Sequence, residues 1–469
     1  MLTTFTAPAF AKTWYIEDGD ITISASETKG TNKVSQGAEP EVEDTGTIIT
    51  NREKDASSHT VTINAGNDKV EVTLDNVNIK ADSGSALISK GDVTLTLKGD
   101  NHLTGGNGGS SSYGGDGITS SGSLTISGGT VTATGGDSTS SVGSGGSGIY
   151  SVSGDVTISG GTVNANGGDG KNGSGGGSGI DSSGGVTVSG GTVTANGGDS
   201  KDGDGGSGKN GNGGDGIRSF NPVAISGGTV NANGGNSDYS NGGDGIRSLD
   251  HVAISGGTVK SNGGSGNLSG GNGIISYDID LSGSLELTAK AGKGNRSNGM
   301  ALSQNGYELD PNTFKEKLDP GANIITKDAD GKVIDQVSIP RPVEPEGPVI
   351  PEESSSSSDS GSATPSAPVS SLPGLTVTDK DGQRISYTST QSGNTLTVCV
   401  GRLTASFRIS LAALRQLRAE GIDTITFQTI LCSTTLSVDE LLAMGGEDTE
   451  VVLIHHIRSS TLTVGGKAV

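Results

Sequence analysis

The stretch GGSGIDSSGGVTVSGGTVTANGGD, residues 176–199, returns with small changes along the middle of the chain. It joins a G-G-x-G-I-x-S block to a block of the form V-x-I-S-G-G-T-V-x-A-N-G-G. The first block begins at Gly114, Gly145, Gly176, Gly213, Gly242 and, in degenerate form, Gly270. Self-similarity at a period of about thirty residues indicates a repeat architecture, in which each unit buries its apolar face only against its neighbours.

Alignment of the copies places apolar residues in columns. Within a copy they alternate with Ser and Thr at period two, as in residues 156–158, which predicts short strands with one buried face. The columns are Ile118, Ile149, Ile180, Ile217, Ile246 and Ile274; Ile126, Ile158, Val188, Ile225 and Ile254; and Val131, Val163, Val193, Val230 and Val259. Short strands separated by Gly-Gly corners predict a mainly β protein, a parallel β-helix whose coils lie about 4.8 Å apart.

A fourth column is polar. Asn166, Asn196, Asn233 and Asn262 stand in register just before a Gly-Gly pair, and Thr134 replaces Asn in the first copy. Stacked amides bond to one another and tolerate the backbone of a corner, so we expect an asparagine ladder.

Two alternatives, a β-propeller and a disordered chain, fit the pattern less well. Propeller blades recur every 40 to 50 residues or so with four longer strands. The copies here start 31, 31, 37, 29 and 28 residues apart, which is too short for a blade. Strict apolar columns also argue against a glycine-rich disordered chain, because disorder does not require isoleucine in register.

The charge balance narrows the classes of partner. The chain has 31 basic and 52 acidic residues and a net charge of −21, which excludes a general nucleic-acid binder and favours solubility or cation binding. We expect residues 1–11 to be the remnant of a signal peptide, because Ala9-Phe10-Ala11 forms a cleavage signal although no basic region precedes it. Export to the bacterial surface or medium is therefore expected, and no stretch is long and apolar enough for a membrane helix.

Changes in amino-acid composition along the chain predict the domain organisation. Residues 12–339 are expected to form the β-helix, with opening coils to about residue 101 and closing coils from Leu281. Residues 340–373 are rich in Pro, Ser and Glu and predict a linker. Residues 374–469 predict a small α+β module with helices after Ser410 and Ser437. It could attach the β-helix to a surface or partner. Its two cysteines, Cys399 and Cys432, could form one disulfide or stay as free thiols.

Several segments together resemble a known family. Residues 13–23 (TWYIEDGDITI), residues 72–79 (VTLDNVNI) and the repeated blocks are similar to exported proteins of clostridial anaerobes that contain a carbohydrate-binding domain. The resemblance covers roughly residues 12–310. It implies a right-handed parallel β-helix shaped like polysaccharide lyases, bound calcium ions, and affinity for cellulose and acidic pectic chains without established catalysis. It assigns no individual calcium ligand.

The variable position of the G-I-x-S block offers a candidate carbohydrate-binding surface. Side chains there point outward because the preceding Ile points inward. This position holds Tyr150, Asp181, Arg218 and Arg247 in successive copies, and the position two residues later holds Phe220 and Tyr277 in two of them. Arginine forks suit carboxylates and aromatic faces suit sugar rings, so the strip predicts a site for a uronate chain. The alternative is a solvated face on which Asp181 pairs with Arg218, worth about 0 to 1 kcal/mol.

Acidic residues in the loops predict a candidate metal site. Asp116, Asp215 and Asp244 fill the same slot in G-G-D-G-I, and further loop acids are Asp137, Asp169, Asp199, Asp202 and Asp204. We expect stacked Asp215 and Asp244 to repel each other unless a cation or water intervenes, and flexible oxygen-rich loops suit calcium. The alternative is a turn-forming role for each Asp.

Three functions remain open at this stage. The first is a secreted or cell-surface, non-catalytic protein that binds plant-cell-wall or other polysaccharide with calcium. The second is a surface adhesin or structural spike without a sugar site, which the 3% aromatic content favours. The third is a polysaccharide lyase, for which the cluster of Asp181, Arg218 and Arg247 is the candidate, although neither a hydrolase triad nor a zinc motif is present.

Overall fold

A computed structural model describes residues 12–109, 113–139, 143–201, 211–340, 374–379, 384–385, 387–392, 394–400, 404–429, 433–446, 449–455, 460–465 and 467–468. Contacts between Cα atoms divide the chain into two compact units, with the boundary between Gly347 and Pro348. The expected signal remnant, all but the first residue of the expected linker, and Cys432 lie outside the described residues.

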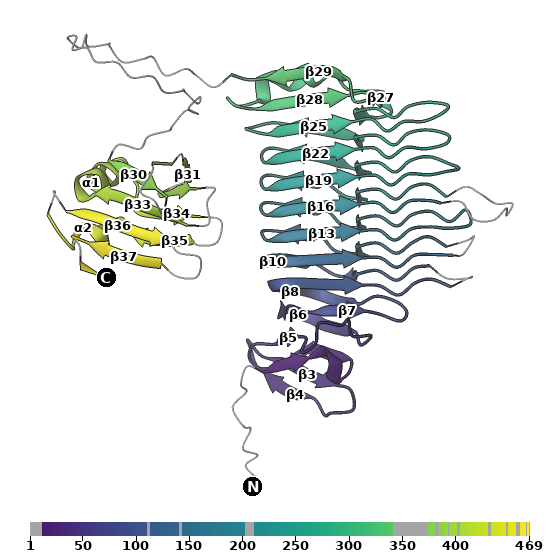
Figure 1. The fold of residues 1–469 in the computed structure, drawn as a ribbon, viewed down its shortest axis with the longest axis horizontal. Coiled ribbons are helices and arrows are strands. Elements are labelled where there is room, and N and C mark those ends of the chain that lie inside the picture. Colours follow the sequence, from purple (N-terminus) through teal and green to yellow (C-terminus); the bar gives the residue numbers. More distant parts are fainter. Residues whose placement is uncertain are drawn as a thin grey trace, which may run out of the picture. The chain divides into compact units, whose positions relative to one another are not determined.

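The first unit is a stack of coils in which three strands recur (Figure 1). The first column contains β9 (Ile118–Ser121), β11 (Ile149–Ser151), β14 (Ile180–Ser182), β17 (Ile217–Ser219), β20 (Ile246–Ser248), β23 (Ile274–Ser276) and β26 (Leu302–Gln304). The second contains the start of β10 (Leu124–Thr134), then β12 (Val156–Ile158), β15 (Val186–Val188), β18 (Val223–Ile225), β21 (His251–Ile254) and β24 (Asp278–Leu281). The third contains the end of β10, then β13 (Thr162–Asn166), β16 (Thr192–Asn196), β19 (Thr229–Asn233), β22 (Thr258–Asn262), β25 (Glu286–Lys290) and β28 (Asn323–Lys327).

Every strand in these columns pairs in parallel with its equivalent in the next coil. Ile149 is opposite Ile180, Ile158 is opposite Val188, and Val163 is opposite Val193. The three predicted apolar columns are fully buried and form one continuous core. The predicted parallel β-helix is therefore confirmed, and its handedness stays a prediction.

Both ends of the stack carry antiparallel strands. The N-terminal end contains β1 (Thr13–Tyr15), η1 (Ile16–Asp18), β2 (Ile21–Ala25), β3 (Asn32–Gln36), β4 (Val42–Asp44), β5 (Ile48–Thr50), β6 (Val61–Asp75), β7 (Asn78–Lys80) and β8 (Leu87–Thr104). There β2, β3 and β4 pair in antiparallel fashion. The C-terminal end contains β27 (Tyr307–Glu308), η2 (Pro311–Lys317) and β29 (Val333–Ser338), and β29 runs antiparallel to β28. These strands cover the open edges that a stack of parallel coils leaves at its ends.

The predicted asparagine ladder is confirmed. Each amide nitrogen donates to the side-chain oxygen of the preceding coil, from Asn196 to Asn166, from Asn233 to Asn196 and from Asn262 to Asn233, at 2.8 Å in each case. The ladder satisfies amide groups at the end of the third column, where the chain turns into a loop.

The Gly-Gly pairs build a second ladder, made of backbone alone. Gly168 N–H donates to Gly146 O at 2.8 Å, Gly177 N–H to Gly168 O at 2.9 Å, and Gly198 N–H to Gly177 O at 2.8 Å. The bonds thus alternate between the pair that ends one block and the pair that begins the next. A Cβ atom on Gly167 would lie 1.9 Å from Gly177 O, so no side chain fits between the two pairs. We call this arrangement the glycine zipper.

In the part of the second unit that the structure describes, the chain forms two sheets and two short helices. One sheet contains β30 (Leu375–Thr378), β33 (Ala405–Ser410), β36 (Glu450–His455), β37 (Ser460–Val464) and β38 (Lys467–Ala468), and the other contains β31 (Thr388–Ser392), β32 (Thr395–Cys399), β34 (Thr424–Gln428) and β35 (Ser433–Ser437). Helices α1 (Leu411–Ala419) and α2 (Val438–Leu442) begin after Ser410 and Ser437, whose hydroxyls cap them as expected. Neither helix in the described chain has the length and apolar character needed to cross a bilayer.

Candidate functional site

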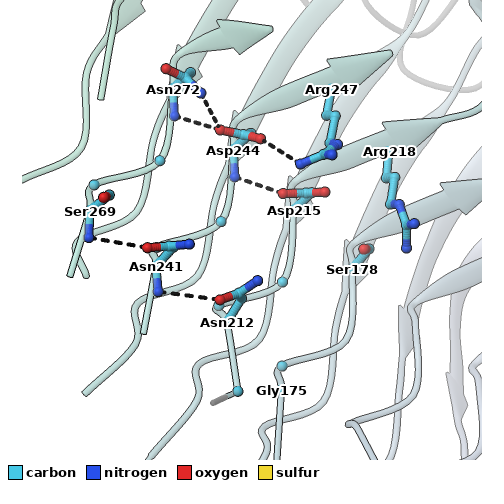
Figure 2. Close-up of a pocket in the computed structure, with 18 of the residues that line it drawn as sticks. Gly175, Ser178, Asn212, Asp215, Arg218, Asn241, Asp244, Arg247, Ser269 and Asn272 are labelled. Atoms are coloured by element: carbon cyan, nitrogen blue, oxygen red, sulfur yellow. Dashed lines mark hydrogen bonds and ion pairs between the residues drawn. The ribbon is translucent and has the colours of Figure 1, made fainter. Parts of the chain in front are cut away.

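A groove of about 730 Å³ crosses five successive copies on the loop side of the stack. Figure 2 shows three columns of side chains along it. The first holds Ser178, Asp215, Asp244 and Asn272; the second holds Gly175, Asn212, Asn241 and Ser269; and the third holds Arg218 and Arg247. Glycines of the zipper lie between the first two columns, so the groove is shallow and lined by backbone and polar groups. We call it the arginine groove.

The acidic column is held by hydrogen bonds between coils. Asp244 N–H donates to Asp215 Oδ1 at 2.7 Å, Asn272 N–H donates to Asp244 Oδ1 at 2.6 Å, and Met300 N–H donates to Asn272 Oδ1 at 2.9 Å. The Asp244 N–H thus reaches the Asp215 carboxylate, and the expected repulsion between the two acids remains, because the Asp244 carboxylate raises the pKa of Asp215. Asp116 makes the same bond to Ser147 N–H at 2.7 Å, but it does not line the groove.

These residues do not fit a calcium site. Calcium takes six to eight or so oxygen ligands. Oδ1 of Asp215 and Oδ1 of Asp244 already accept backbone N–H groups, and Oδ2 of Asp244 lies 3.4 Å from the Arg247 guanidinium. No group of three or more His, Cys, Asp or Glu side chains in the described part of the chain is placed to hold a metal ion. Calcium binding by this protein stays a prediction, without an assigned site.

The other loop acids form a similar column. Asp169 N–H donates to Asp137 Oδ1 at 3.0 Å, and Asp199 N–H donates to Asp169 Oδ1 at 2.9 Å. Lys171 and Lys201 pair with these carboxylates. These bonds join one coil to the next, whereas Asp202 and Asp204 lie outside the described residues.

The predicted outward strip is in register. Tyr150 is opposite Asp181, Asp181 is opposite Arg218, and Arg218 is opposite Arg247. Of these four residues, only the two arginines line the groove. Arg218 pairs with Asp181 at 3.4 Å and Arg247 with Asp244 at 3.4 Å, each through one nitrogen. Most of the donors of each guanidinium are therefore left for a ligand.

Aromatic residues stand beside the groove rather than in it. Phe220 is 44% exposed, and the Arg218 guanidinium lies 5.0 Å from its ring centroid. Tyr277 is 63% exposed and lines a second hollow of about 220 Å³ together with Leu249. This hollow shares Arg247 and Ile275 with the arginine groove, so the two are continuous. We call it the tyrosine shelf.

Four carboxyl groups of the G-G-x-G-I-x-S blocks hold their protons more tightly than usual. Burial, reinforced by the nearby Asp244 carboxylate, raises the pKa of Asp215 to about 7. Burial also raises the pKa of Asp244, against the opposing effects of Asn272 and Arg247. The pKa values of Asp181 and Asp116 are raised by burial as well, and Arg218 partly offsets the change at Asp181.

Sequence reasoning missed the second column of the groove. Asn212 and Asn241 stand immediately before G-G-D-G-I in two copies, and Asn241 N–H donates to Asn212 Oδ1 at 3.3 Å. Ser269 continues the column, since its N–H donates to Asn241 Oδ1 at 3.2 Å. The signal was present in the position before each G-G-x-G-I block, which holds Tyr, Ser, Gly, Asn, Asn and Ser in successive copies and so does not form a strict column.

Comparison with known proteins supports the repeat. A β-helix repeat family model matches residues 124–148, 156–178 and 223–246, and each match begins at the second strand of one coil and ends at or just before the first strand of the next. No curated protein and no solved structure gives a significant match. The matched segments are a minor part of the chain, so the resemblance to clostridial carbohydrate-binding proteins stays a prediction. What the chain shares with known proteins is the β-helix repeat itself.

Proposed function

We propose that the stacked coils bind an extended acidic polysaccharide in the arginine groove, outside the cell and without cleaving it. The observation that carries this proposal is the stacking of Arg218 and Arg247 one coil apart beside the groove. A guanidinium presents a planar fork that matches a carboxylate, and both side chains are partly exposed.

The repeat itself favours a linear, repeating ligand. Equivalent positions recur about every 4.8 Å along a stack of paired strands. A polymer lying along the groove meets an arginine on one side and Asn212 or Asn241 on the other in successive coils. Amide groups at these positions offer both donors and acceptors to sugar hydroxyls.

The tyrosine shelf supports binding of a sugar ring next to the carboxylate contact. Tyr277, Leu249 and Ile275 present an apolar surface, and Arg247 belongs to both the shelf and the groove. A pyranose has an apolar face of C–H groups that an exposed aromatic ring can cover, while its carboxylate reaches the arginine. A sugar acid therefore fits the junction of the two hollows.

The fold by itself does not exclude the two alternative functions, a lyase and an adhesin. β-helices occur in polysaccharide lyases and in proteins without catalytic activity, so the scaffold does not decide between them. An adhesin without a sugar site would leave the groove as a solvated face. One set of measurements distinguishes polysaccharide binding, lyase activity and adhesion without a sugar site.

The test is retention of the full chain on insoluble polygalacturonate and on cellulose, with calcium and with a chelator, while the supernatant is monitored for unsaturated uronate. We expect retention on polygalacturonate without product. The variant Arg218→Ala/Arg247→Ala should lose at least tenfold in affinity, equivalent to about 1.4 kcal/mol. The matched control Lys260→Ala/Arg296→Ala removes two exposed cations outside the groove and should bind as the parent does.

The remaining outcomes distinguish the alternatives. Retention on neither polymer contradicts the proposal and favours adhesion or a structural role. Release of unsaturated product identifies a lyase. Equal loss in the two double variants shows that overall charge, rather than the groove, holds the polymer. Loss of retention in the chelator shows that binding depends on calcium, without locating the ion.

A further inference from the structure

Two copies carry the same D-G-I-R sequence, at residues 215–218 and 244–247, but their ion pairs differ. Arg247 pairs with Asp244 of its own copy at 3.4 Å. Arg218 instead pairs with Asp181 of the preceding copy, also at 3.4 Å. Within the described residues, this leaves Oδ2 of Asp215 without an ion pair or hydrogen bond.

The position of Asp215 places this oxygen on the groove. Figure 2 shows one carboxylate oxygen of Asp215 accepting the N–H of Asp244 while the other points toward the side on which Arg218 lies. Asp215, Arg218 and Arg247 all line the same groove. A ligand carboxylate that contacts the two arginines therefore comes next to Asp215.

Burial and the Asp244 carboxylate favour the neutral form of Asp215, whereas the Asp244 N–H and the two facing arginines oppose it. The preceding coil offers Ser178, which is uncharged, and the following coil offers the Asp244 carboxylate. Arg218 and Arg247 are the cations that face it, and each is paired with another Asp. Burial and the Asp244 carboxylate together raise the pKa of Asp215 to about 7, so a large part of the protein carries the proton at neutral pH.

We propose that neutral Asp215 donates a hydrogen bond to a carboxylate of the bound acidic chain, between Arg218 and Arg247, and that this residue makes binding depend on pH. The inference rests on the proposed function and names the residue that selects a sugar acid over a neutral sugar. A hydrogen bond to a charged acceptor is stronger than a neutral one. The ionised form of Asp215 would instead repel the ligand.

The direction of the pH effect follows from linkage. Binding requires the proton on Asp215, so affinity is constant at low pH and falls by up to about tenfold per pH unit once Asp215 ionises in the free protein. Ligand carboxylates remain ionised throughout the range 5.5 to 8.5 or so, because their ordinary pKa is near 3.5. A cationic ligand at Asp215 would show the opposite trend.

The test measures affinity for soluble polygalacturonate from pH 5.5 to 8.5 with the full chain. We expect wild-type affinity to fall at least fivefold across this range. Asp215→Asn should keep the low-pH affinity at every pH, because an amide donates without titrating. The variant should also fold, since Asn272 occupies the same column and its Oδ1 accepts the next backbone N–H at 2.9 Å.

Asp116→Asn is the matched control. Asp116 has the same bond to the next coil and a pKa raised by burial, but it lies outside the groove. This variant should keep the wild-type pH profile. If it loses the pH dependence as Asp215→Asn does, the effect is structural and the inference is overturned.

The outcomes separate this inference from the proposed function. Absence of binding at every pH overturns both. Wild-type binding that is independent of pH, or a pH profile that persists in Asp215→Asn, overturns the inference alone. Affinity that rises with pH shows that Asp215 meets a cation and overturns the inference. A ¹³C titration of the carboxyl groups is independent of any ligand, and an Asp215 that ionises below pH 5 also overturns the inference.

Discussion

Gly177 N–H donates to Gly168 O at 2.9 Å, and the site that a Cβ atom of Gly177 would occupy is 1.9 Å from Gly146 O. The two glycine pairs on either side of each loop are thus in direct backbone contact. This contact continues through the stack, with Gly198 N–H bonded to Gly177 O and Gly214 N–H bonded to Gly198 O. It accounts for a strict requirement for glycine at positions where φ lies outside the left-handed region, so that backbone contact rather than chain conformation excludes a side chain.

We predict that Gly177→Ala destabilises the β-helix by about 3 kcal/mol, because the added methyl group must displace backbone atoms that are hydrogen-bonded on both sides. Chemical denaturation of the full chain, followed by the loss of β-sheet signal, measures this. Gly160→Ala is the control, since a Cβ atom there meets nothing within 4 Å. It should change stability by less than about 0.5 kcal/mol. Equal stability of the two variants would contradict the zipper.

The asparagine ladder makes a second prediction about stability. Asn196 both donates to Asn166 and accepts from Asn233, whereas Asn262 donates to Asn233 and accepts nothing from the next coil, where Lys290 stands opposite. Asn196→Ala should therefore cost about 1 to 3 kcal/mol and Asn262→Ala about half as much. Thermal unfolding of the two variants measures the difference, and an equal or reversed order would show that the ladder bonds do not stabilise the stack.

The strand register was predictable from the sequence because it depends on buried side chains that cannot be exchanged with outward ones. Shifting Ile180 by one residue would place Asp181 in the core, so the apolar columns specify the pairing. The glycine zipper was not predictable, because glycines carry no side chain that records which backbone they touch. The ion-pair partner of Arg218 could not be predicted for a different reason. Asp181 lies opposite Arg218 in the preceding coil and Asp215 lies three residues before it in its own copy, and only the folded geometry shows that Asp181 is the partner.

Burial of Asp215 predicts a pH-dependent stability of the β-helix. Its pKa in the folded protein is about 7 against an ordinary value of 3.8, so the folded state holds the proton more tightly than the unfolded state. Stability is then fully present below about pH 4 and is lost as the pH rises through 7. Asp215→Asn removes this loss and should stabilise the protein by on the order of 2 kcal/mol at pH 8, with little effect at pH 4. Denaturation of both proteins at the two pH values measures this, and stabilisation that is the same at both would contradict it.

The second unit contains a buried histidine, for which we predict that stability falls, rather than rises, as the pH is lowered. His455 on β36 is fully buried, packs against Phe407 with ring centroids 5.4 Å apart, and places Nε2 2.9 Å from Thr434 Oγ1. Its Nδ1 has no hydrogen-bond partner among the described residues. Burial lowers the pKa of His455 below its ordinary value of 6.5, because the imidazolium would lose its hydration without gaining a counter-charge.

Because the unfolded state binds this proton more readily than the folded state, the stability that neutral His455 contributes is present above about pH 6.5 and is lost as the pH falls. We expect amide hydrogen exchange in β33 and β36 to quicken between pH 7 and pH 5, after correction for the intrinsic effect of pH on exchange. His455→Phe keeps an aromatic ring beside Phe407 but cannot take up a proton, so its protection should be the same at both pH values. Protection in the coils of the β-helix serves as the internal reference, since His455 belongs to the other compact unit. If the variant and the parent lose protection equally on acidification, a group other than His455 controls the module.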